Sequence, residues 1–291
     1  MSNLYIYPYN SNSESAKLLA ERLGAKRIKL QNSEYVHKED NFILNWGNSN
    51  CPYTSRVLNP GSAIKNTVDK LDFFRKMVAN GFSQHIPTYY TNPADIPICD
   101  FPVLCRTSTT GMDGAGIVVA RNRDELVAAP LYTKYIGNST EYRVTIFKGE
   151  VTDIQTKLPR AGESFDPIIK TYANGWGFQR LPVPPHIRDK IVEVAKIALE
   201  VAGLDFGGVD VVRSGSLGRA FVLEVNTAMG LEGQALERFA EAVERYLATT
   251  LAEAPVNTLE EPSEGPTEAI IDLVKSERWV EALVMIAKRM T

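Results

Sequence analysis

Cysteine and histidine are scarce in this sequence, with three residues of each among 291. No two cysteines have the C-x-x-C spacing of a metal or redox motif, and an odd number of cysteines cannot all pair within the chain. We therefore expect reduced thiols with structural roles, and neither a disulfide framework nor a zinc site. The six residues are Cys51, Cys99, Cys105, His37, His85 and His186.

Long apolar segments are also missing. No stretch approaches the roughly 18 uninterrupted apolar residues that a membrane-spanning helix needs. The first residues, MSNLYIYPYNSNSES, lack the basic start and apolar run of a secretory signal. We expect a cytoplasmic protein without a membrane partner.

Neither sign of charge dominates. The sequence has 32 Lys and Arg against 35 Asp and Glu, a formal net charge of −3. This balance argues against a general nucleic-acid binder, although a local basic cleft remains compatible with it. A hydrophobic share of 44% and a charged share of 23% are ordinary for a globular fold. A chain of 291 residues is long enough for two or three lobes with separate cores.

Alternating strand and helix patterns predict a mixed α/β (α+β) fold. Two apolar strand patterns flank an N-terminal helix pattern that opens with serine and closes with glycine, which predicts a small βαβ lobe over residues 1–68. A central lobe is expected over 69–130 and a C-terminal lobe over 131–252. Residues 253–291 are expected to form a linker and a C-terminal helix. Residues 161–185 form a long irregular stretch, and loops of that length are often functional.

Two short apolar strands, GVDVV and LEVN, carry the most informative acids. If the turn between them centres near Leu217, Asp210 lies opposite Glu224 with Cβ atoms roughly 5 Å apart. Asn226 shares a face with Glu224, because side chains alternate along a strand. Three oxygen ligands would converge there, and neighbouring carboxylates repel one another without a cation, so we expect Mg²⁺. Ordinary acids on a solvated sheet face are the alternative.

These strands, together with G-L-E-G at residues 230–233, resemble the metal-binding end of the ATP-grasp superfamily. The likeness is to its RimK-like branch in particular, which joins amino acids to peptide or protein carboxyl ends. It implies an ATP-grasp fold in which the small βαβ lobe precedes two α+β lobes that clasp ATP. It also implies that Asp210, Glu224 and Asn226 hold two Mg²⁺ ions, for which Mn²⁺ can substitute. Ala228 and Met229 depart from the small residue and proline that usually precede G-L-E-G.

The resemblance continues upstream in the family's order. Lys70, at the start of a helix, resembles the first phosphate-binding lysine, and Arg106 stands where the family normally has a second lysine. The segment TSTTGMDGA resembles the glycine-rich flap that closes over the β- and γ-phosphates. The flap residues expected to contact the nucleotide are Thr110, Gly111 and Gly114. Taken alone, Lys70 could be a surface lysine and the glycines an ordinary hairpin turn.

The segment LYTKYIGNSTEYRV resembles the part of the family that lines the adenine pocket. The resemblance implies that the backbone of Thr133, Lys134 and Tyr135 contacts the adenine edge. Tyr135 or Ile136 would pack on its face, and Glu141 would accept hydrogen bonds from the ribose. Lys134 stands where family members often carry an acid. Glu141 alone could equally be a surface acid at the start of a strand.

Lys157 and Arg160, at the end of the next strand, resemble the cations that meet the γ-phosphate and the acyl phosphate. An exposed basic strand end is the alternative. Some ligases of the family place an arginine two residues before the first metal-binding acid, where it steadies the tetrahedral intermediate. Gly208 stands there, so we assign that task to Arg160 or Arg180. Further candidates for binding a substrate carboxylate are Arg143, Lys170 and Arg180.

The resemblance implies an ATP-dependent carboxylate–amine ligase that forms an amide or peptide bond through an acyl phosphate and releases ADP and phosphate. Its partners would be small-molecule, peptide or protein carboxylates and amines, and a homodimer is compatible with the family. The alternatives are an ATP-grasp kinase acting on a hydroxyl group and a non-catalytic nucleotide-binding pseudoenzyme. ADP formation that depends on a hydroxyl compound would distinguish the kinase.

Overall fold

The computed structural model describes residues 3–111 and 114–252. The chain divides into two compact units, Met1–Arg245 and Tyr246–Thr291. All of the sheets and cavities described below belong to the first unit. The predicted linker and C-terminal helix at 253–291 lie outside the described residues.

The first sheet is parallel, with the strand order β2-β1-β3-β4. Its strands are β1 (Leu4–Pro8), β2 (Lys26–Arg27), β3 (Phe42–Trp46) and β4 (Val57–Leu58). Helix α1 (Glu14–Leu23) begins after the capping hydroxyl of Ser13 and ends at Gly24, which adopts a φ of 60°. The predicted βαβ arrangement and both helix ends are confirmed.

The second sheet is antiparallel, with the strand order β5-β8-β6-β7. Its strands are β5 (Tyr89–Tyr90), β6 (Val103–Arg106), β7 (Ile117–Ala120) and β8 (Leu131–Lys134). Four short 3₁₀ helices lie in the same part of the sequence, at η1 (Ser83–His85), η2 (Pro93–Asp95), η3 (Ile98–Asp100) and η4 (Arg123–Glu125). The glycine-rich flap connects β6 to β7, so paired strands fix both of its ends.

The third sheet is antiparallel, with the strand order β11-β10-β9-β12-β13. Its strands are β9 (Ser139–Phe147), β10 (Glu150–Pro159), β11 (Trp176–Gln179), β12 (Phe206–Ser214) and β13 (Ala220–Asn226). The expectation of an irregular stretch over 161–185 is wrong for β11. Strand β11 pairs with the end of β10 and becomes the edge strand of the sheet. It forms because the backbone N–H and C=O groups of β10 provide its hydrogen-bond partners.

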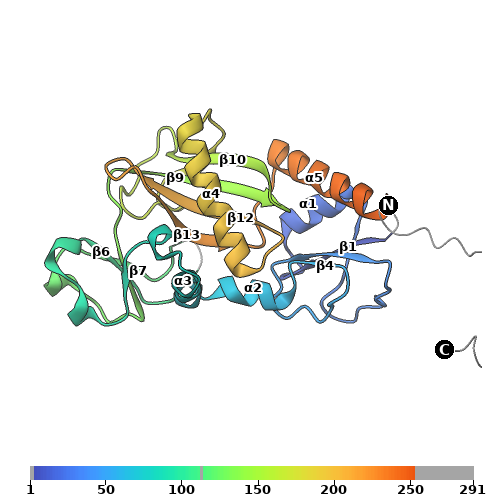
Figure 1. Cartoon of the computed structure of the whole chain (residues 1–291), viewed down its shortest axis with the longest axis horizontal. Coiled ribbons are helices and arrows are strands. Elements are labelled where there is room, and N and C mark those ends of the chain that lie inside the picture. Colours follow the sequence, from blue (N-terminus) through green and yellow to red (C-terminus); the bar gives the residue numbers. More distant parts are fainter. Residues whose placement is uncertain (1–2, 112–113, 253–291) are drawn as a thin grey trace, which may run out of the picture. The chain divides into compact units, whose positions relative to one another are not determined.

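Four α-helices accompany the sheets: α2 (Gly61–Val68), α3 (Lys70–Ala79), α4 (Pro185–Ala202) and α5 (Gly233–Ala252). Helix α4 lies along one face of the third sheet (Figure 1) and contacts β9, β12 and β13. A large hydrophobic core fills this interface. It contains Phe73 and Phe74 from α3, Leu199 from α4, and Val209 and Val222 from the sheet. Burial of these apolar side chains holds the sheet that carries the predicted metal ligands.

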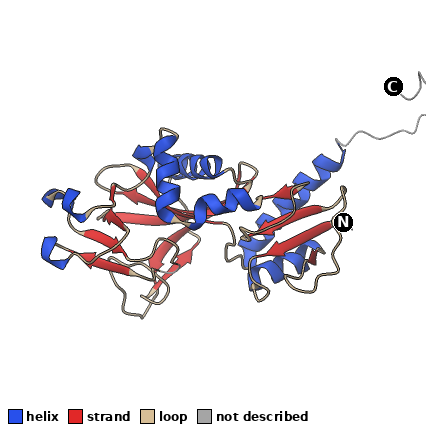
Figure 2. Ribbon diagram, turned by 90° about the horizontal axis from the view of Figure 1, so that it is seen from below, coloured by secondary structure: helices blue, strands red, loops and turns tan. Residues whose placement is uncertain are grey.

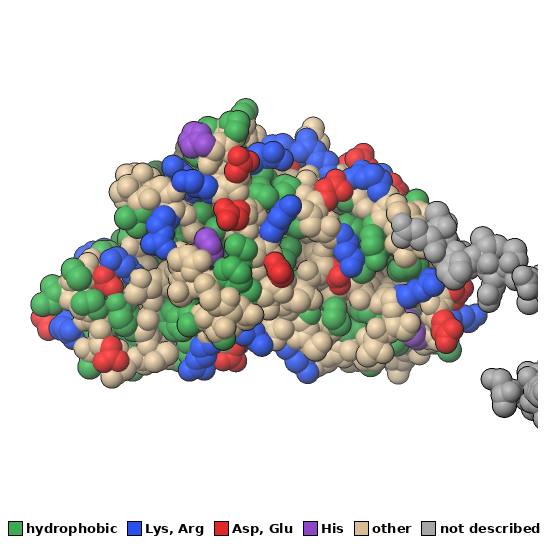
Figure 3. Space-filling model, viewed as in Figure 1, with side chains coloured by type: hydrophobic (Ala, Val, Ile, Leu, Met, Phe, Trp, Pro, Cys, Tyr) green, Lys and Arg blue, Asp and Glu red, His purple; other side chains and the backbone are tan. Residues whose placement is uncertain are grey.

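Figure 2 shows the strands of the three sheets with the helices packed around them. On the face shown in Figure 3, basic and acidic side chains are interspersed, as the near-balanced composition predicts. In the part of the chain that is described, none of the helices combines the length and the apolar composition of a membrane span.

Asn59 joins the first sheet to the third. Its side chain is completely buried and makes three hydrogen bonds to the start of β12. Nδ2 donates to the Phe206 carbonyl at 2.9 Å, and Oδ1 accepts from the N–H groups of Asp205 and Phe206 at 2.8 and 3.1 Å. Asn59 adopts a φ of 61°, a left-handed conformation that asparagine tolerates better than most residues.

Replacing Asn59 with alanine should therefore lower the free energy of unfolding by about 3 kcal/mol, since three buried backbone groups lose their partners. Asn66→Ala is the matched control, because it removes a single hydrogen bond, from Nδ2 to the Ala202 carbonyl. We expect it to lower the free energy of unfolding by about 1 kcal/mol. Urea denaturation measures both values. Equal losses for the two variants would contradict the role of Asn59.

Candidate active site

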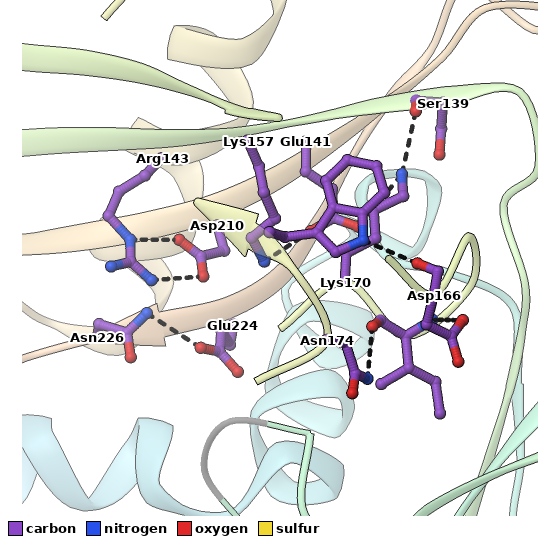
Figure 4. A network of polar contacts seen from close by, with 12 residues as sticks. Ser139, Glu141, Arg143, Lys157, Asp166, Lys170, Asn174, Asp210, Glu224 and Asn226 are labelled. Atoms are coloured by element: carbon purple, nitrogen blue, oxygen red, sulfur yellow. Dashed lines mark hydrogen bonds and ion pairs between the residues drawn. The ribbon is translucent and has the colours of Figure 1, made fainter. Parts of the chain in front are cut away.

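The β12–β13 hairpin brings the two predicted metal-binding acids together. Asp210 is the register partner of Glu224, as predicted. Asn226 lies beside them, and its Nδ2 donates a hydrogen bond of 3.1 Å to Oε1 of Glu224 (Figure 4). The pairing of the acids is confirmed, while their role as metal ligands stays a prediction.

Each acid is paired with a largely buried cation. Arg143, directly opposite Asp210 on β9, donates from Nε and Nη2 to its two carboxylate oxygens at 2.7 and 2.8 Å. Nζ of Lys70 lies 3.2 Å from Oε2 of Glu224. Burial alone would raise the pKa of Glu224, but the charge of Lys70 and the hydrogen bond from Asn226 outweigh it and lower the pKa to about 2. Glu224 is therefore ionised at neutral pH.

The donor atoms fit a hard divalent cation. Asp210 and Glu224 offer carboxylate oxygens and Asn226 an amide oxygen, which are ligand types that Mg²⁺ prefers. Within residues 3–111 and 114–252, no group of three or more His, Cys, Asp and Glu side chains could hold a metal. The remaining ligands would therefore be water and phosphate oxygens. Both oxygens of Asp210 accept from Arg143, so a metal bound there would compete with the guanidinium for the same carboxylate.

A cavity of about 310 Å³ opens beside the acids. Strands of the second and third sheets both contribute to its walls. The predicted site residues that line it are Lys70, Arg106, Gly111, Gly114, Thr133, Lys134, Tyr135, Ile136, Glu141, Lys157, Asp210 and Glu224. Thr110 and Asn226 line an adjoining second cavity, and Arg160 lines neither. Most of the predicted site residues therefore line the first cavity.

Cations outnumber acids on the walls of this first cavity, with six Lys and Arg side chains against three Asp and Glu. Nζ of Lys157 lies 2.9 Å from Oε2 of Glu141, and Nζ of Lys170 lies 3.6 Å from Oε1 of the same residue. Nε of Arg106 donates to the hydroxyl of Thr133 at 3.3 Å. An excess of positive charge in a partly enclosed space favours a polyanion such as a polyphosphate.

The end of β8 and the residues after it, Lys134, Tyr135 and Ile136, line the cavity. The N–H groups of Lys134 and Tyr135 already donate to backbone carbonyls, at 2.9 and 3.1 Å. The N–H of Ile136 has no hydrogen-bond acceptor among the described residues. The Lys134 ammonium bonds to Asp100 at 2.6 Å. A ligand on this segment would therefore find its backbone donor at Ile136.

The flap approaches the loop between β10 and β11. Gly114 adopts a φ of 74°, and a Cβ at this position would lie 2.6 Å from Cγ2 of Thr171 and 3.3 Å from Cγ2 of Ile169. Trp176 anchors the second loop, since its Nε1 donates to the carbonyl of Asp166 at 2.8 Å. Asp166 belongs to this second loop, and Figure 4 shows it close to the polar network of the site. Glycine at position 114 therefore allows the two loops to meet over the cavity.

Gly114→Ala should weaken the binding of a fluorescent ATP analogue by about ten-fold, equivalent to about 1.4 kcal/mol, because the added methyl group separates the two loops. Gly149→Ala is the matched control. Gly149 has a φ of 79° and nothing within 4 Å of the Cβ position, so it carries the same backbone strain without the contact. We expect it to leave the dissociation constant unchanged. Equal weakening by both variants would contradict the loop contact.

Arg160 and Arg180 are held away from the cavity. Arg180 donates from Nε and Nη2 to the buried Asp153 at 2.8 and 2.9 Å. Nη2 of Arg160 donates to the Tyr172 carbonyl at 2.9 Å and lies 2.5 Å from Oε2 of Glu163. Neither arginine lines either cavity. These positions give no support to the prediction that one of them steadies a reaction intermediate.

Phe178 contacts two of the cations that line the site. Its ring centroid lies 4.3 Å from Cζ of Arg143 and 5.0 Å from Nζ of Lys157. Phe178 therefore positions both cations through cation–π contacts.

Neither protein-family models nor curated proteins match this sequence. Solved structures do match it. The D-alanine–D-alanine ligase of Bacillus anthracis is 15% identical, with a TM-score of 0.56 over 86% of this chain and 100% of that chain. The ATP-grasp ligase PsnB, complexed with a minimal precursor, is 12% identical, with a TM-score of 0.59 over 84% and 99%. The chain has the ATP-grasp fold.

A third example is the RiPP-associated ATP-grasp ligase of Chryseobacterium gregarium, solved with ADP and a leader and core peptide. It is 15% identical, with a TM-score of 0.56 over 86% of this chain and 97% of that chain. At 12–15% identity the likeness establishes the ATP-grasp fold. The fold class predicted from the hairpin acids and the flap is confirmed.

Proposed function

We propose that this chain is an ATP-dependent carboxylate–amine ligase that forms an amide or peptide bond and releases ADP and phosphate. The observation that carries the proposal is the pair of opposed acids, Asp210 and Glu224, in one cavity with an excess of lysine and arginine. Phosphoryl transfer requires alignment and charge neutralisation more than a dedicated base. The ATP-grasp proteins with this fold named above are ligases, which favours carboxylate activation as the reaction.

ATP would lie along the first cavity. The Ile136 N–H, which lacks an acceptor among the described residues, supplies a donor for the adenine edge beside Tyr135. Glu141 would accept hydrogen bonds from the ribose hydroxyls. Lys70 and Arg106, together with the flap N–H groups, would contact the phosphates. The loops that meet at Gly114 would then exclude water from the γ-phosphate.

The metal site would be formed by Asp210, Glu224 and Asn226. Bound Mg²⁺ would neutralise the phosphate oxygens and hold the γ-phosphate in line for transfer. We propose two ions, in line with the family resemblance, and Mn²⁺ as a substitute because it favours the same oxygen ligands. The G-L-E-G motif supports a place in the RimK-like branch. A cytoplasmic location and a homodimer stay predictions from the sequence.

The reaction has two steps. A substrate carboxylate oxygen attacks the γ-phosphorus, the bond to the β–γ bridging oxygen breaks, and ADP leaves with the electron pair. An amine nitrogen then attacks the acyl carbon of the acyl phosphate. The tetrahedral intermediate collapses to the amide, phosphate departs, and the nitrogen loses a proton. Lys157, held by Glu141 at 2.9 Å, would stabilise the charge on the transferred phosphate.

Arg143 is the arginine best placed to stabilise the tetrahedral intermediate. It lines both cavities, so its guanidinium lies where nucleotide and substrate would meet. A Cβ at Gly208 would lie 3.6 Å from Cδ of Arg143. The arginine on β9 therefore occupies the space beside β12 that the missing side chain of Gly208 leaves open. When a metal binds Asp210, the guanidinium of Arg143 would instead donate its hydrogen bonds to the oxyanion of the intermediate.

The test is ADP release from Mg·ATP in the presence of carboxylates alone, amines alone and both together. The ligase proposal expects release that requires both classes of substrate and yields an amide detectable by mass spectrometry. ADP release that requires only a hydroxyl compound and yields a phosphoester would identify a kinase instead. ATP binding without release under any of these conditions would favour a non-catalytic protein.

A further inference from the structure

A second cavity, of about 590 Å³, adjoins the first. The two share Lys70, Gly111, Arg143 and Glu224 on their walls. This shared border is the place where the proposed transfer of the γ-phosphate would occur. The volume lies within the range of roughly 300–1,000 Å³ that is typical of sites for small ligands. A substrate in the second cavity can therefore present its reacting group at the border.

The buried Asn45 holds in place the loop of Asn48, which forms part of one wall of this cavity. Nδ2 of Asn45 donates to the carbonyls of Asn48 and Asn59 at 2.9 and 2.8 Å. The Asn48 N–H donates back to Oδ1 of Asn45 at 3.1 Å. A Cβ at Gly47 would lie 2.7 Å from Cβ of Ala228, so the loop after β3 packs directly on the loop after β13. The wall is fixed by hydrogen bonds and close packing, which suits a specific ligand.

Charge in the second cavity is confined to its border. Among the described residues that line it, the charged side chains are Lys70, Arg143 and Glu224. Both cations already bond to acids, since Nζ of Lys70 lies 3.2 Å from Glu224 and Nε of Arg143 lies 2.7 Å from Asp210. A carboxylate or ammonium placed beyond the border would have no oppositely charged partner among the described residues of the walls. Removing water from a charge that gains no partner is unfavourable.

Beyond the border, neutral hydrogen-bonding groups stand beside apolar ones. Asn50, Thr67 and Thr227 supply amides and hydroxyls. Phe73 and Met229 supply buried apolar surface. Amides and hydroxyls bond well to the N–H and C=O groups of a peptide, and apolar surface accepts short side chains.

We propose that the second cavity binds its substrate as a neutral, peptide-like chain and discriminates against free amino acids. The inference rests on the proposed ligase function and deepens it by naming a substrate class. In a peptide, the groups next to the reacting carboxylate or amine are uncharged amides. A free amino acid brings a second charge within a few bonds of the reacting group, into the part of the cavity that lacks an ionic partner.

Two pools from the same protein test this inference: a partial protease digest of casein, and the free amino acids that an exhaustive peptidase digest of the same casein yields. The full chain is supplied with Mg·ATP and each pool at equal residue concentration, and ADP is measured. We expect the peptide pool to support release at least about ten-fold faster, corresponding to 1.4 kcal/mol of discrimination. Equal or faster release with the amino-acid pool overturns the inference and leaves the ligase intact. No release with either pool counts against the ligase proposal itself.

A charge added to the wall should change this preference. Val68 lines the second cavity and is 50% exposed, so Val68→Arg adds a cation without disturbing the core. We expect it to raise release with the amino-acid pool about ten-fold, because a free α-carboxylate gains a partner. Val78→Arg is the matched control, since Val78 is 43% exposed and lines neither cavity. An unchanged ratio between the pools in Val68→Arg would contradict the neutral wall.

Discussion

Replacing Glu224 with glutamine should reduce Mg²⁺-dependent ADP release by on the order of 10³-fold, or about 4 kcal/mol of transition-state stabilisation. Glutamine keeps the shape and one amide oxygen but removes the charge opposite Asp210. That charge is fully developed in the native protein, because the pKa of Glu224 is lowered to about 2. A divalent cation would lose one of its two carboxylates, and the ammonium of Lys70 would lose its acidic partner.

The effect should appear in metal dependence more than in nucleotide binding. Titration of ATP without Mg²⁺ should give similar dissociation constants for the wild type and Glu224→Gln, while half-saturation with Mg²⁺ should move to much higher concentration. Glu241→Gln is the control, an exposed acid on α5 that lines neither cavity. ADP release by Glu224→Gln at a rate within about three-fold of the wild type would contradict the proposed metal site.

Replacing Arg143 with methionine should lower the turnover number by on the order of 10²–10³-fold, the magnitude typical of losing a donor to a developing oxyanion. The same change should tighten Mg²⁺ binding. In the structure the guanidinium donates two hydrogen bonds to Asp210, of 2.7 and 2.8 Å, and an incoming ion competes with it for that carboxylate. Methionine retains much of the side-chain volume against Phe178 and removes that competition.

Lower turnover together with tighter Mg²⁺ binding would distinguish a catalytic role of Arg143 from a purely structural one. Arg143→Lys keeps a positive charge but cannot donate two parallel hydrogen bonds. We therefore expect its turnover number to lie between those of the wild type and Arg143→Met. Isothermal titration with Mg²⁺ and steady-state ADP release measure the two quantities on the same preparations. Weaker Mg²⁺ binding in parallel with lower turnover would indicate that Arg143 only supports the hairpin, and would contradict the proposed catalytic role.

The sequence predicted the elements whose side-chain pattern is strong and local. The alternating apolar residues of GVDVV and LEVN were enough to place Asp210 opposite Glu224. Helix α2 was missed because its sequence, GSAIKNTV, contains mostly poor helix formers. Its buried Ala63 and Ile64 pack into the main core, and this tertiary contact outweighs weak propensity. Strand β11 was missed for the same reason, since a partner strand and not its own composition defines it.

The sequence alone could not identify which arginine lies nearest to the proposed intermediate. Arg160 and Arg180 were favoured as the cation near the intermediate, but their partners Glu163 and Asp153 hold them elsewhere. Arg143 lies next to Gly208 because β9 and β12 pair in a particular register. That register depends on the packing of the whole third sheet, which local periodicity does not reveal.

Transfer of an oxygen atom from the substrate carboxylate to phosphate would distinguish an acyl-phosphate ligase from a kinase. The carboxylates of a peptide digest are labelled by exchange in acidic ¹⁸O-water, and the full chain then reacts with Mg·ATP and these peptides in ordinary water. Activation through an acyl phosphate predicts one ¹⁸O atom in each phosphate released, in an amount equal to the ADP formed. ADP accompanied by unlabelled phosphate, or by phosphate esterified to a hydroxyl, would contradict the ligase account.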